Sequence, residues 1–235
     1  MYSKLTRNLD QFIRFQLEQY TTQPLQKKKV HPVITISREF GCEGFPVAKM
    51  LAEKLKSEDG MDWLVYNREL VKKFTNIDGF DEEMMSLLNE QQRSQVDEYV
   101  DHLLAHKPSN YSLYQKLARS VRALSERGHC IIIGSGGAIL TADIPNSLNI
   151  RLKAKLPFRI NRISNELSIS KDEAKVLIDE NDESRSNLIK KFTRQDVNNP
   201  RFYDLIIDNE KFSAEQITEI ILLALNQRIP GWRND

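Results

Sequence analysis

The first stretch whose residues could bind a ligand is a glycine-containing loop between an expected strand and an expected helix. Residues 34–49 show a buried-type strand, then a loop with Gly41 and Gly44, and directly afterwards an amphipathic helix. Such a junction exposes backbone N–H groups and the positive end of a helix dipole, and a phosphate group fits there. Pro46 suits the first helical turn because its missing N–H would be unpaired there anyway. The anion-binding residues predicted from this loop are Gly41, Cys42, Glu43, Gly44 and Phe45.

The same loop has a purely structural interpretation. Two glycines after a strand also occur in an ordinary tight turn between a strand and a helix. The standard phosphate-loop pattern G-x-x-x-x-G-K-[ST] is absent. The loop by itself therefore leaves both interpretations open.

Arg38 follows the first expected strand directly and is the cation nearest to the loop. Since the loop has no lysine, Arg38 is a candidate for placing positive charge beside a phosphate. The alternative is a salt bridge to Glu39 or Glu43.

A second group of cations lies in residues 157–195. Arg159 and Arg162 are three residues apart, on one face of an expected helix, and Arg185 is followed by Lys191 and Arg194. Arginine suits phosphoryl groups because it stays charged and can hold two oxygens at once. The alternative is a set of solvated surface charges balanced by the acidic residues at 179–183.

Two other patterns are weaker. Cys42 lies near an expected helix N-terminus, a position that can lower a thiol pKa, although an inert loop cysteine is the simpler interpretation. His102 and His106 have a spacing that can bind zinc on a helix. No third ligand is evident, so a surface pair is favoured and no metal site is predicted.

The length, composition and net charge indicate a compact α/β protein rather than a strongly charged binding module. The chain has 235 residues, 40% of them hydrophobic and 29% charged, with a formal net charge of +1. This balance provides no global attraction for nucleic acid or a membrane surface. Two cysteines are too few for a disulfide framework, and no stretch resembles a signal peptide or a membrane span. We therefore expect a cytoplasmic location.

The apolar patterns divide the chain into a helical extension at 1–30 and one α/β domain at 31–235. Strands are expected at 33–37, 63–66, 130–134, 147–152 and 204–208, and several lack alternation, as in sheets covered on both faces. Two intervals, about 68–110 and about 157–195, are too long for simple crossovers. The extension is interpreted as a helix that packs on the domain or forms a homodimer, with a membrane-surface helix as the weaker alternative.

Several stretches resemble the cytidylate kinase-like family, in the family's order. They are Ile36-Ser-Arg-Glu-Phe-Gly41, Trp63-Leu-Val-Tyr-Asn-Arg-Glu-Leu70, Ile131-Ile-Ile-Gly134, the stretch 149–163, and Asn198-Asn-Pro-Arg-Phe-Tyr-Asp-Leu-Ile-Ile-Asp208. The resemblance covers about residues 33–225. It implies a P-loop NTPase-type three-layer fold with a five-stranded parallel sheet, an acceptor-binding insertion at about 68–110 and a lid at about 157–195.

The resemblance also implies a reaction. ATP, with Mg²⁺, would donate its γ-phosphoryl group to a nucleoside monophosphate, CMP or dCMP, which makes these nucleotides the expected partners. Such a transfer depends on positioning and on cancelling negative charge. The catalytic residues implied are Arg185, Arg159 and Arg38. Further nucleotide contacts come from the loop residues and from Arg162, Lys191 and Arg194.

The chain departs from the family pattern at several positions. Gly44 and Pro46 stand at the loop's lysine and Ser/Thr positions, Glu43 replaces a glycine, Ser135 replaces an arginine, and Asn67 replaces an aspartate. A carboxylate inside a phosphate-binding loop is unfavourable unless it points away or meets a metal. Two alternatives therefore remain: a nucleotide-binding pseudokinase with an interaction role for its N-terminal helix, and a helical scaffold indifferent to nucleotides.

Overall fold

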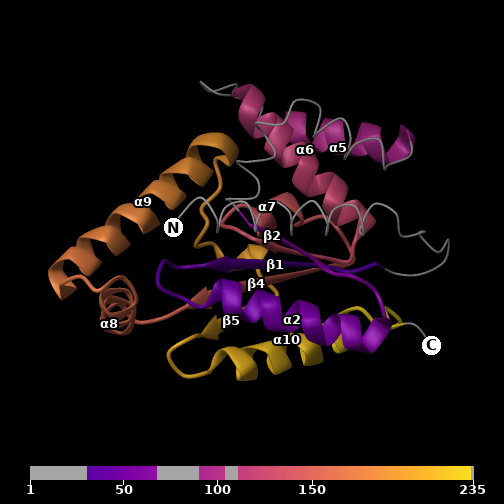
Figure 1. The fold of residues 1–235 in the computed structure, drawn as a ribbon. Helices are drawn as coiled ribbons and strands as arrows, with labels where there is room; N and C mark the ends of the chain where they lie inside the picture. Colours follow the sequence, from indigo (N-terminus) through magenta and orange to yellow (C-terminus); the bar gives the residue numbers. More distant parts are fainter. Residues whose placement is uncertain (1–30, 68–89, 104–110, 234–235) are drawn as a thin grey trace, which may run out of the picture.

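The computed structural model describes residues 31–67, 90–103 and 111–233. A parallel sheet forms the centre of this part, with helices above and below it (Figure 1). The expected N-terminal helix at 1–30, the segment 68–89 and His106 lie outside the described residues. Within the described helices, none is long and apolar enough to cross a membrane.

The sheet has five strands in the order β2-β3-β1-β4-β5, and all its strand pairs are parallel. The strands are β1 (Val33–Arg38), β2 (Leu64–Asn67), β3 (Cys130–Ile133), β4 (Ser147–Lys153) and β5 (Leu205–Asp208). The central strand β1 is buried on both faces: Ile34 and Ile36 are buried, and so are Thr35 and Ser37 between and after them. This order and the helices around it confirm the predicted three-layer P-loop NTPase-type fold.

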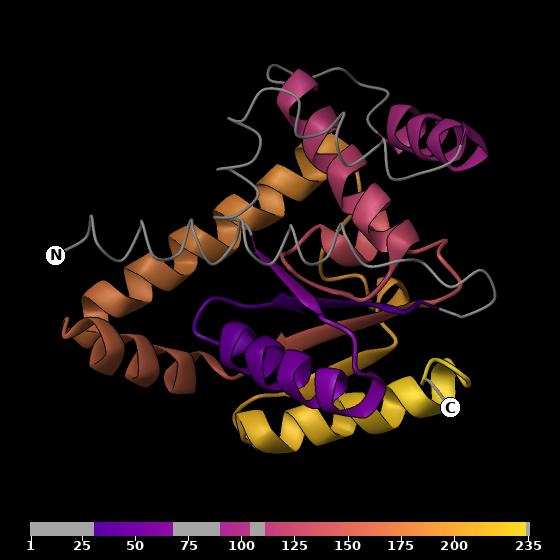
Figure 2. The same ribbon diagram turned by 45° about the vertical axis from the view of Figure 1, so that its right-hand side comes forward.

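Two helices, α2 (Gly44–Asp59) and α10 (Ala214–Arg228), cover one face of the sheet and lie side by side in Figures 1 and 2. Leu51 and Leu55 of α2 pack with Ile217 and Ile221 of α10 over the buried residues of the sheet. Ser213 and Gln216 form a capping box at the start of α10.

The opposite face carries α5 (Glu90–Leu103), α6 (Tyr111–Arg127) and α7 (Gly137–Leu140). Val96 and Val100 of α5 join Val121 and Leu124 of α6 in a core cluster over β2 and β3. Burial of these residues completes the third layer, and it places α6 over the carboxyl ends of the strands.

Helices α8 (Leu156–Leu167) and α9 (Lys171–Thr193) project beyond the edge of the sheet (Figure 2). Ile163, Ala174 and Ile178 pack the two helices together, and Ser170 and Glu173 form a capping box at the start of α9. The C-terminal half of α9 returns to α6. After the short helix η1 (Pro200–Phe202) the chain enters β5. The α9 helix thus connects the outer end of the projection with the main body.

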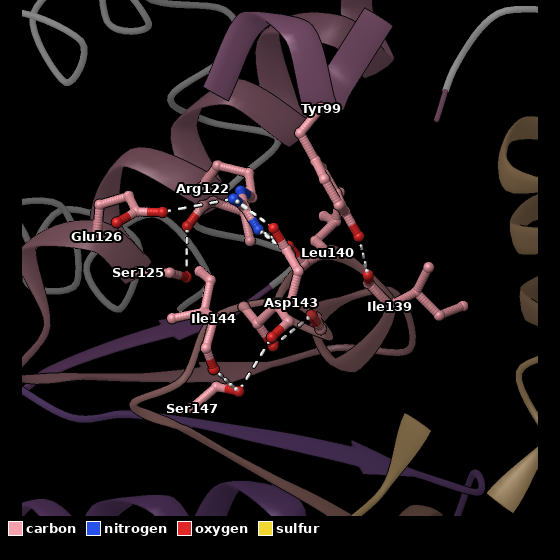
Figure 3. A network of polar contacts seen from close by, with 12 residues as sticks. Tyr99, Arg122, Ser125, Glu126, Ile139, Leu140, Asp143, Ile144 and Ser147 are labelled. Carbon is pink, nitrogen blue, oxygen red and sulfur yellow. Dashed lines mark hydrogen bonds and ion pairs between the residues drawn. The ribbon is translucent and has the colours of Figure 1, made fainter. Parts of the chain in front are cut away.

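A buried arginine ties the helical layer together (Figure 3). Arg122 is 3% exposed, and it donates hydrogen bonds to the carbonyl of Leu140 and to both carboxylate oxygens of Asp143. Glu126 lies 3.4 Å away, and burial raises the pKa of its carboxyl group. The Tyr99 ring stacks 4.2 Å from the guanidinium. Two carboxylates therefore compensate this buried charge.

A histidine cluster lies at the amino-terminal edge of the sheet. His129 is buried between His31 and Trp63, with ring centroids 4.7 Å and 5.3 Å away. The Trp63 Nε1–H group donates to Asp59 Oδ2, which lies 3.6 Å from His129 Nε2. Burial, with smaller contributions from His31 and Arg127, lowers the pKa of His129 to about 4. Burial raises the pKa of Asp59. The pKa values of the two groups are therefore shifted in opposite directions, in each case toward the uncharged form.

We expect His129 to make the fold sensitive to mild acid. The unfolded chain binds a proton at this imidazole near pH 6.5, whereas the folded chain binds it near pH 4, so stability is lost as the pH falls through this window. Asn tolerates the positive φ of 50° at position 129. In the His129→Asn variant, the drop in the free energy of unfolding on acidification should be smaller by roughly 2–3 kcal/mol. Urea unfolding at pH 7 and pH 4.5 tests this. An equal loss in both proteins would contradict it.

Candidate active site

The main cavity, about 480 Å³ in volume, lies at the carboxyl ends of β1, β2 and β3. Parallel strands bring their carboxyl ends to the same edge, and ligands of open α/β sheets bind outside this edge. Most of the lining is apolar and comes from the strand ends, α6 and the C-terminal half of α9. These apolar residues are Tyr66, Tyr114, Leu117, Ala118, Val121, Ile132, Leu140, Leu188, Ile189 and Phe192.

Polar groups gather at one end of the cavity. Arg38 and Arg185 line it, together with Asn67, Ser135 and Asn181. The Arg185 guanidinium lies 5.3 Å from the Phe40 ring centroid. An apolar cavity with cations at one end suits a ligand that has a flat ring and an anionic group.

A smaller pocket of about 170 Å³ adjoins this polar end. Arg38, Ser135 and Arg185 line both spaces. The small pocket adds Arg151 from β4 and the carboxylates of Glu39 and Asp182, with Ser186, Val197 and Asn198 completing its wall. The structure therefore brings two of the predicted arginines together and adds Arg151, which sequence reasoning missed.

The backbone of the glycine loop is largely bonded to the protein itself. The Phe40 amide donates to Asp182 Oδ1 at 2.8 Å, and the Glu43 amide donates to Asn209 Oδ1 at 2.6 Å. The Cys42 amide donates to the Glu39 carbonyl, and the Gly44 amide donates to the Cys42 carbonyl. The predicted gathering of amides toward an anion is therefore not the arrangement seen here.

Glu43 forms a salt bridge with Arg162, one of the predicted phosphate-binding arginines. Its carboxylate lies 2.8 Å from Arg162 Nη1, and it accepts a hydrogen bond from Asn209 Nδ2 at 3.4 Å. A second carboxylate, Glu166, lies 3.9 Å from Arg162 Nε. An internal anion thus sits where the resemblance implies a nucleotide phosphate.

Arg159 is paired in a similar way. It forms a salt bridge with Asp182, donates to the Phe40 carbonyl at 3.2 Å, and lies 3.7 Å from Glu39. These contacts join α8, α9 and the loop after β1. The acidic residues at 179–183, weighed as surface partners in the sequence, thus include one that holds Arg159 against the loop.

Both loop glycines are required by close packing. Gly41 has a φ of +92°, and a Cβ there would lie 3.1 Å from Arg159 Cβ. A Cβ at Gly44 would lie 2.8 Å from Arg38 Cδ. The glycines therefore let α8 and the stem of Arg38 approach the loop, a role that is distinct from contact with a ligand.

The remaining predicted residues differ in their positions. Phe45 is 52% exposed and lines the main cavity. Burial and Glu39 raise the pKa of the Cys42 thiol to about 12, so the structure supports the inert cysteine over the activated thiol. Lys191 and Arg194 are exposed and line neither of these two cavities.

Sequence reasoning missed Arg151 and Asn209, and it treated Asp182 only as a balancing charge. A charged residue inside the apolar run 147–152 was the available signal for Arg151. Asn209 gave no local signal, because its contact with the Glu43 amide joins residues 166 positions apart.

Comparison with known proteins agrees with this architecture. Cytidylate kinases of Methanosarcina barkeri and Methanocaldococcus jannaschii are 26% and 28% identical over 197 and 196 residues, each match covering 83% of this chain and 97% of the relative. The crystal structure of an uncharacterized protein from Eubacterium ventriosum superposes with a TM-score of 0.64 at 20% identity, covering 85% of this chain and 100% of that one. The profile of the cytidylate kinase-like family matches residues 33–211, and the chain therefore belongs to the cytidylate kinase-like family.

Proposed function

We propose that the protein is a nucleoside monophosphate kinase-type phosphotransferase that uses ATP and accepts CMP or dCMP. The observation that carries this proposal is the cavity of about 480 Å³ at the carboxyl edge of the sheet, with Arg38 and Arg185 at its polar end. The choice of a cytidine nucleotide follows the two archaeal relatives, which are cytidylate kinases.

The cavity has a place for each part of a monophosphate. Tyr66, Tyr114 and Phe192 offer aromatic surface for a base, and the Tyr114 and Phe192 rings already stack at 3.4 Å between centroids. Arg38 and Arg185 offer charge to the phosphate. In this proposal α8 and α9 form the lid, the region around α5 belongs to the acceptor-binding insertion, and residues 1–30 are a separate extension.

The fit to ATP and Mg²⁺ is weaker. Pro46 brings no hydroxyl to the loop, and the carboxylates of Glu39 and Glu43 face arginines. Among the described residues, no cluster of three or more His, Cys, Asp or Glu side chains could hold a metal ion. These residues do not form a preformed metal site, so Mg²⁺ would have to enter with the nucleotide phosphates.

Replacing Arg185 by Ala should lower kcat/KM for CMP phosphorylation about 100-fold or more, because a cation facing the transferred phosphoryl group is lost. A coupled assay with ATP and a panel of monophosphates measures this. Arg228→Gln is the control: this exposed residue pairs with Asp204 at 3.7 Å, away from the cavity, and its loss should leave the rate unchanged. Equal rates for Arg185→Ala and the unmodified protein would contradict the proposal.

A second candidate function is nucleotide binding without turnover. The occupied loop amides and the contact between Glu43 and Arg162 favour it, because a donor phosphate must displace both. ATP binding without turnover of any monophosphate would support this pseudokinase. A helical scaffold would show no thermal shift with any nucleotide.

If Glu43 competes with a donor phosphate, Glu43→Gln should tighten ATP binding about tenfold, or about 1.4 kcal/mol. The substitution removes a like charge from the loop and releases Arg162. Stability should change by less than about 1 kcal/mol, because the pair is partly exposed.

Isothermal titration with ATP tests this expectation. Glu166→Gln is the matched control, because it removes the other carboxylate beside Arg162 without touching the loop. Unchanged or weaker ATP binding by Glu43→Gln would show that the carboxylate does not block the site.

A further inference from the structure

Two of the buried arginines, Arg122 and Arg151, differ in the kind of group that they contact. Arg122 is surrounded by the carboxylates of Asp143 and Glu126 (Figure 3). Arg151, on β4, is only 5% exposed, and within the described part of the chain its hydrogen bonds all go to uncharged groups. A buried charge is costly unless an opposite charge meets it. Within the described residues, no carboxylate therefore pairs with Arg151.

The contacts of Arg151 fix the direction of its guanidinium. Nη1 donates to Ser37 Oγ at 3.1 Å and to Tyr203 Oη at 3.3 Å, and Nη2 donates to Asn198 Oδ1 at 2.6 Å. The Tyr203 ring lies 5.5 Å from the guanidinium carbon. These neutral groups hold the planar cation in one orientation without cancelling its charge, which is the preorganisation that an anion site needs.

The cation lines the small pocket of about 170 Å³, beside Arg38 and Arg185. Two carboxylates also line this pocket, but each has other partners. Asp182 pairs with Arg159 and accepts from the Phe40 amide, while Glu39 accepts from the Ala154 amide and lies near Arg159. The pocket thus gathers three arginines, and its acidic residues are engaged by a fourth.

We propose that Arg151 binds the phosphate monoester group of the acceptor nucleotide. This inference rests on the proposed function and adds a residue to it. The pocket shares Arg38, Ser135 and Arg185 with the cavity proposed for the nucleoside, so one ligand can fill both spaces. Ser135, which stands where the family pattern has an arginine, faces the same pocket. The charge absent after β3 is supplied from β4, which lies on the other side of the central strand β1.

The test compares CMP with cytidine, which differ only in the phosphate. Titration calorimetry of the full chain should show CMP binding more tightly than cytidine. Arg151→Met, which removes the charge but keeps much of the length, should weaken CMP binding about 30-fold or more and leave cytidine within about threefold. The CMP affinity of Arg151→Lys should lie between those of the unmodified protein and Arg151→Met, because lysine keeps the charge without the bidentate geometry. ATP affinity should change less than about threefold.

Arg122→Met is the matched control. It removes a buried arginine whose charge is compensated, so it should lower the melting temperature and preserve the ratio of CMP to cytidine affinity. Arg151→Met should not lower the melting temperature of the ligand-free protein, because it removes a buried charge that has no opposite charge beside it. If Arg151→Met fails to fold, the ratio of CMP to cytidine affinity in Arg151→Lys alone decides the question.

The outcomes separate this inference from the proposed function. A protein that phosphorylates CMP but whose Arg151→Met variant keeps the full preference for CMP over cytidine overturns the inference alone. If neither CMP nor cytidine binds, inorganic phosphate is the probe: a thermal shift that Arg151→Met abolishes supports an anion site at Arg151 while the acceptor assignment fails. Absence of any shift overturns the inference, as does a loss of ATP binding without a loss of CMP binding.

Discussion

Compensation of arginine charge is the interaction on which the carboxyl edge of the sheet depends. Arg159 and Arg162 join α8 to the loop after β1 through Asp182 and Glu43. Together with the hydrogen bonds of Asp182 and Arg159 to the Phe40 backbone, these ion pairs hold the projecting helices against the loop. Burial makes the pairing of Arg159 consequential, since a charge removed from water and left alone is strongly destabilising, whereas the Arg162–Glu43 pair is partly exposed. Arg151 stands out because its surroundings orient it but do not neutralise it.

The same interactions explain why this member of the cytidylate kinase-like family is an unusual candidate enzyme. The loop that resembles a phosphate site has bonded most of its amides internally, and it carries a carboxylate that already holds Arg162. The neighbouring cavity keeps an apolar body and a cationic end. In the proposed function, the acceptor half of the site is thus better formed than the donor half. Under the same proposal, a donor nucleotide would have to displace Glu43 from Arg162.

The opposite edge of the sheet is held by other forces. His129, Trp63 and Asp59 form a buried cluster in which neutral rings pack around a single carboxylate. Because burial disfavours a second charge, the imidazole stays neutral at pH 7 and its pKa is low. The arginines of the site edge are therefore held by ion pairs, whereas neutral ring packing dominates the His129 cluster.

The sequence by itself determined the layers and the order of the elements. Short β-rich runs such as 33–37 and 130–134 favour buried strands, and the capping boxes at Ser170 and Ser213 set where α9 and α10 begin, because these signals act over a few residues. Only the tertiary structure decided the partners of the charges. Whether Arg162 meets a phosphate or Glu43, and whether Arg151 faces solvent or a pocket, depends on contacts between segments more than a hundred residues apart. Long-range ion pairing leaves no periodic trace in a sequence, so packing alone reveals it.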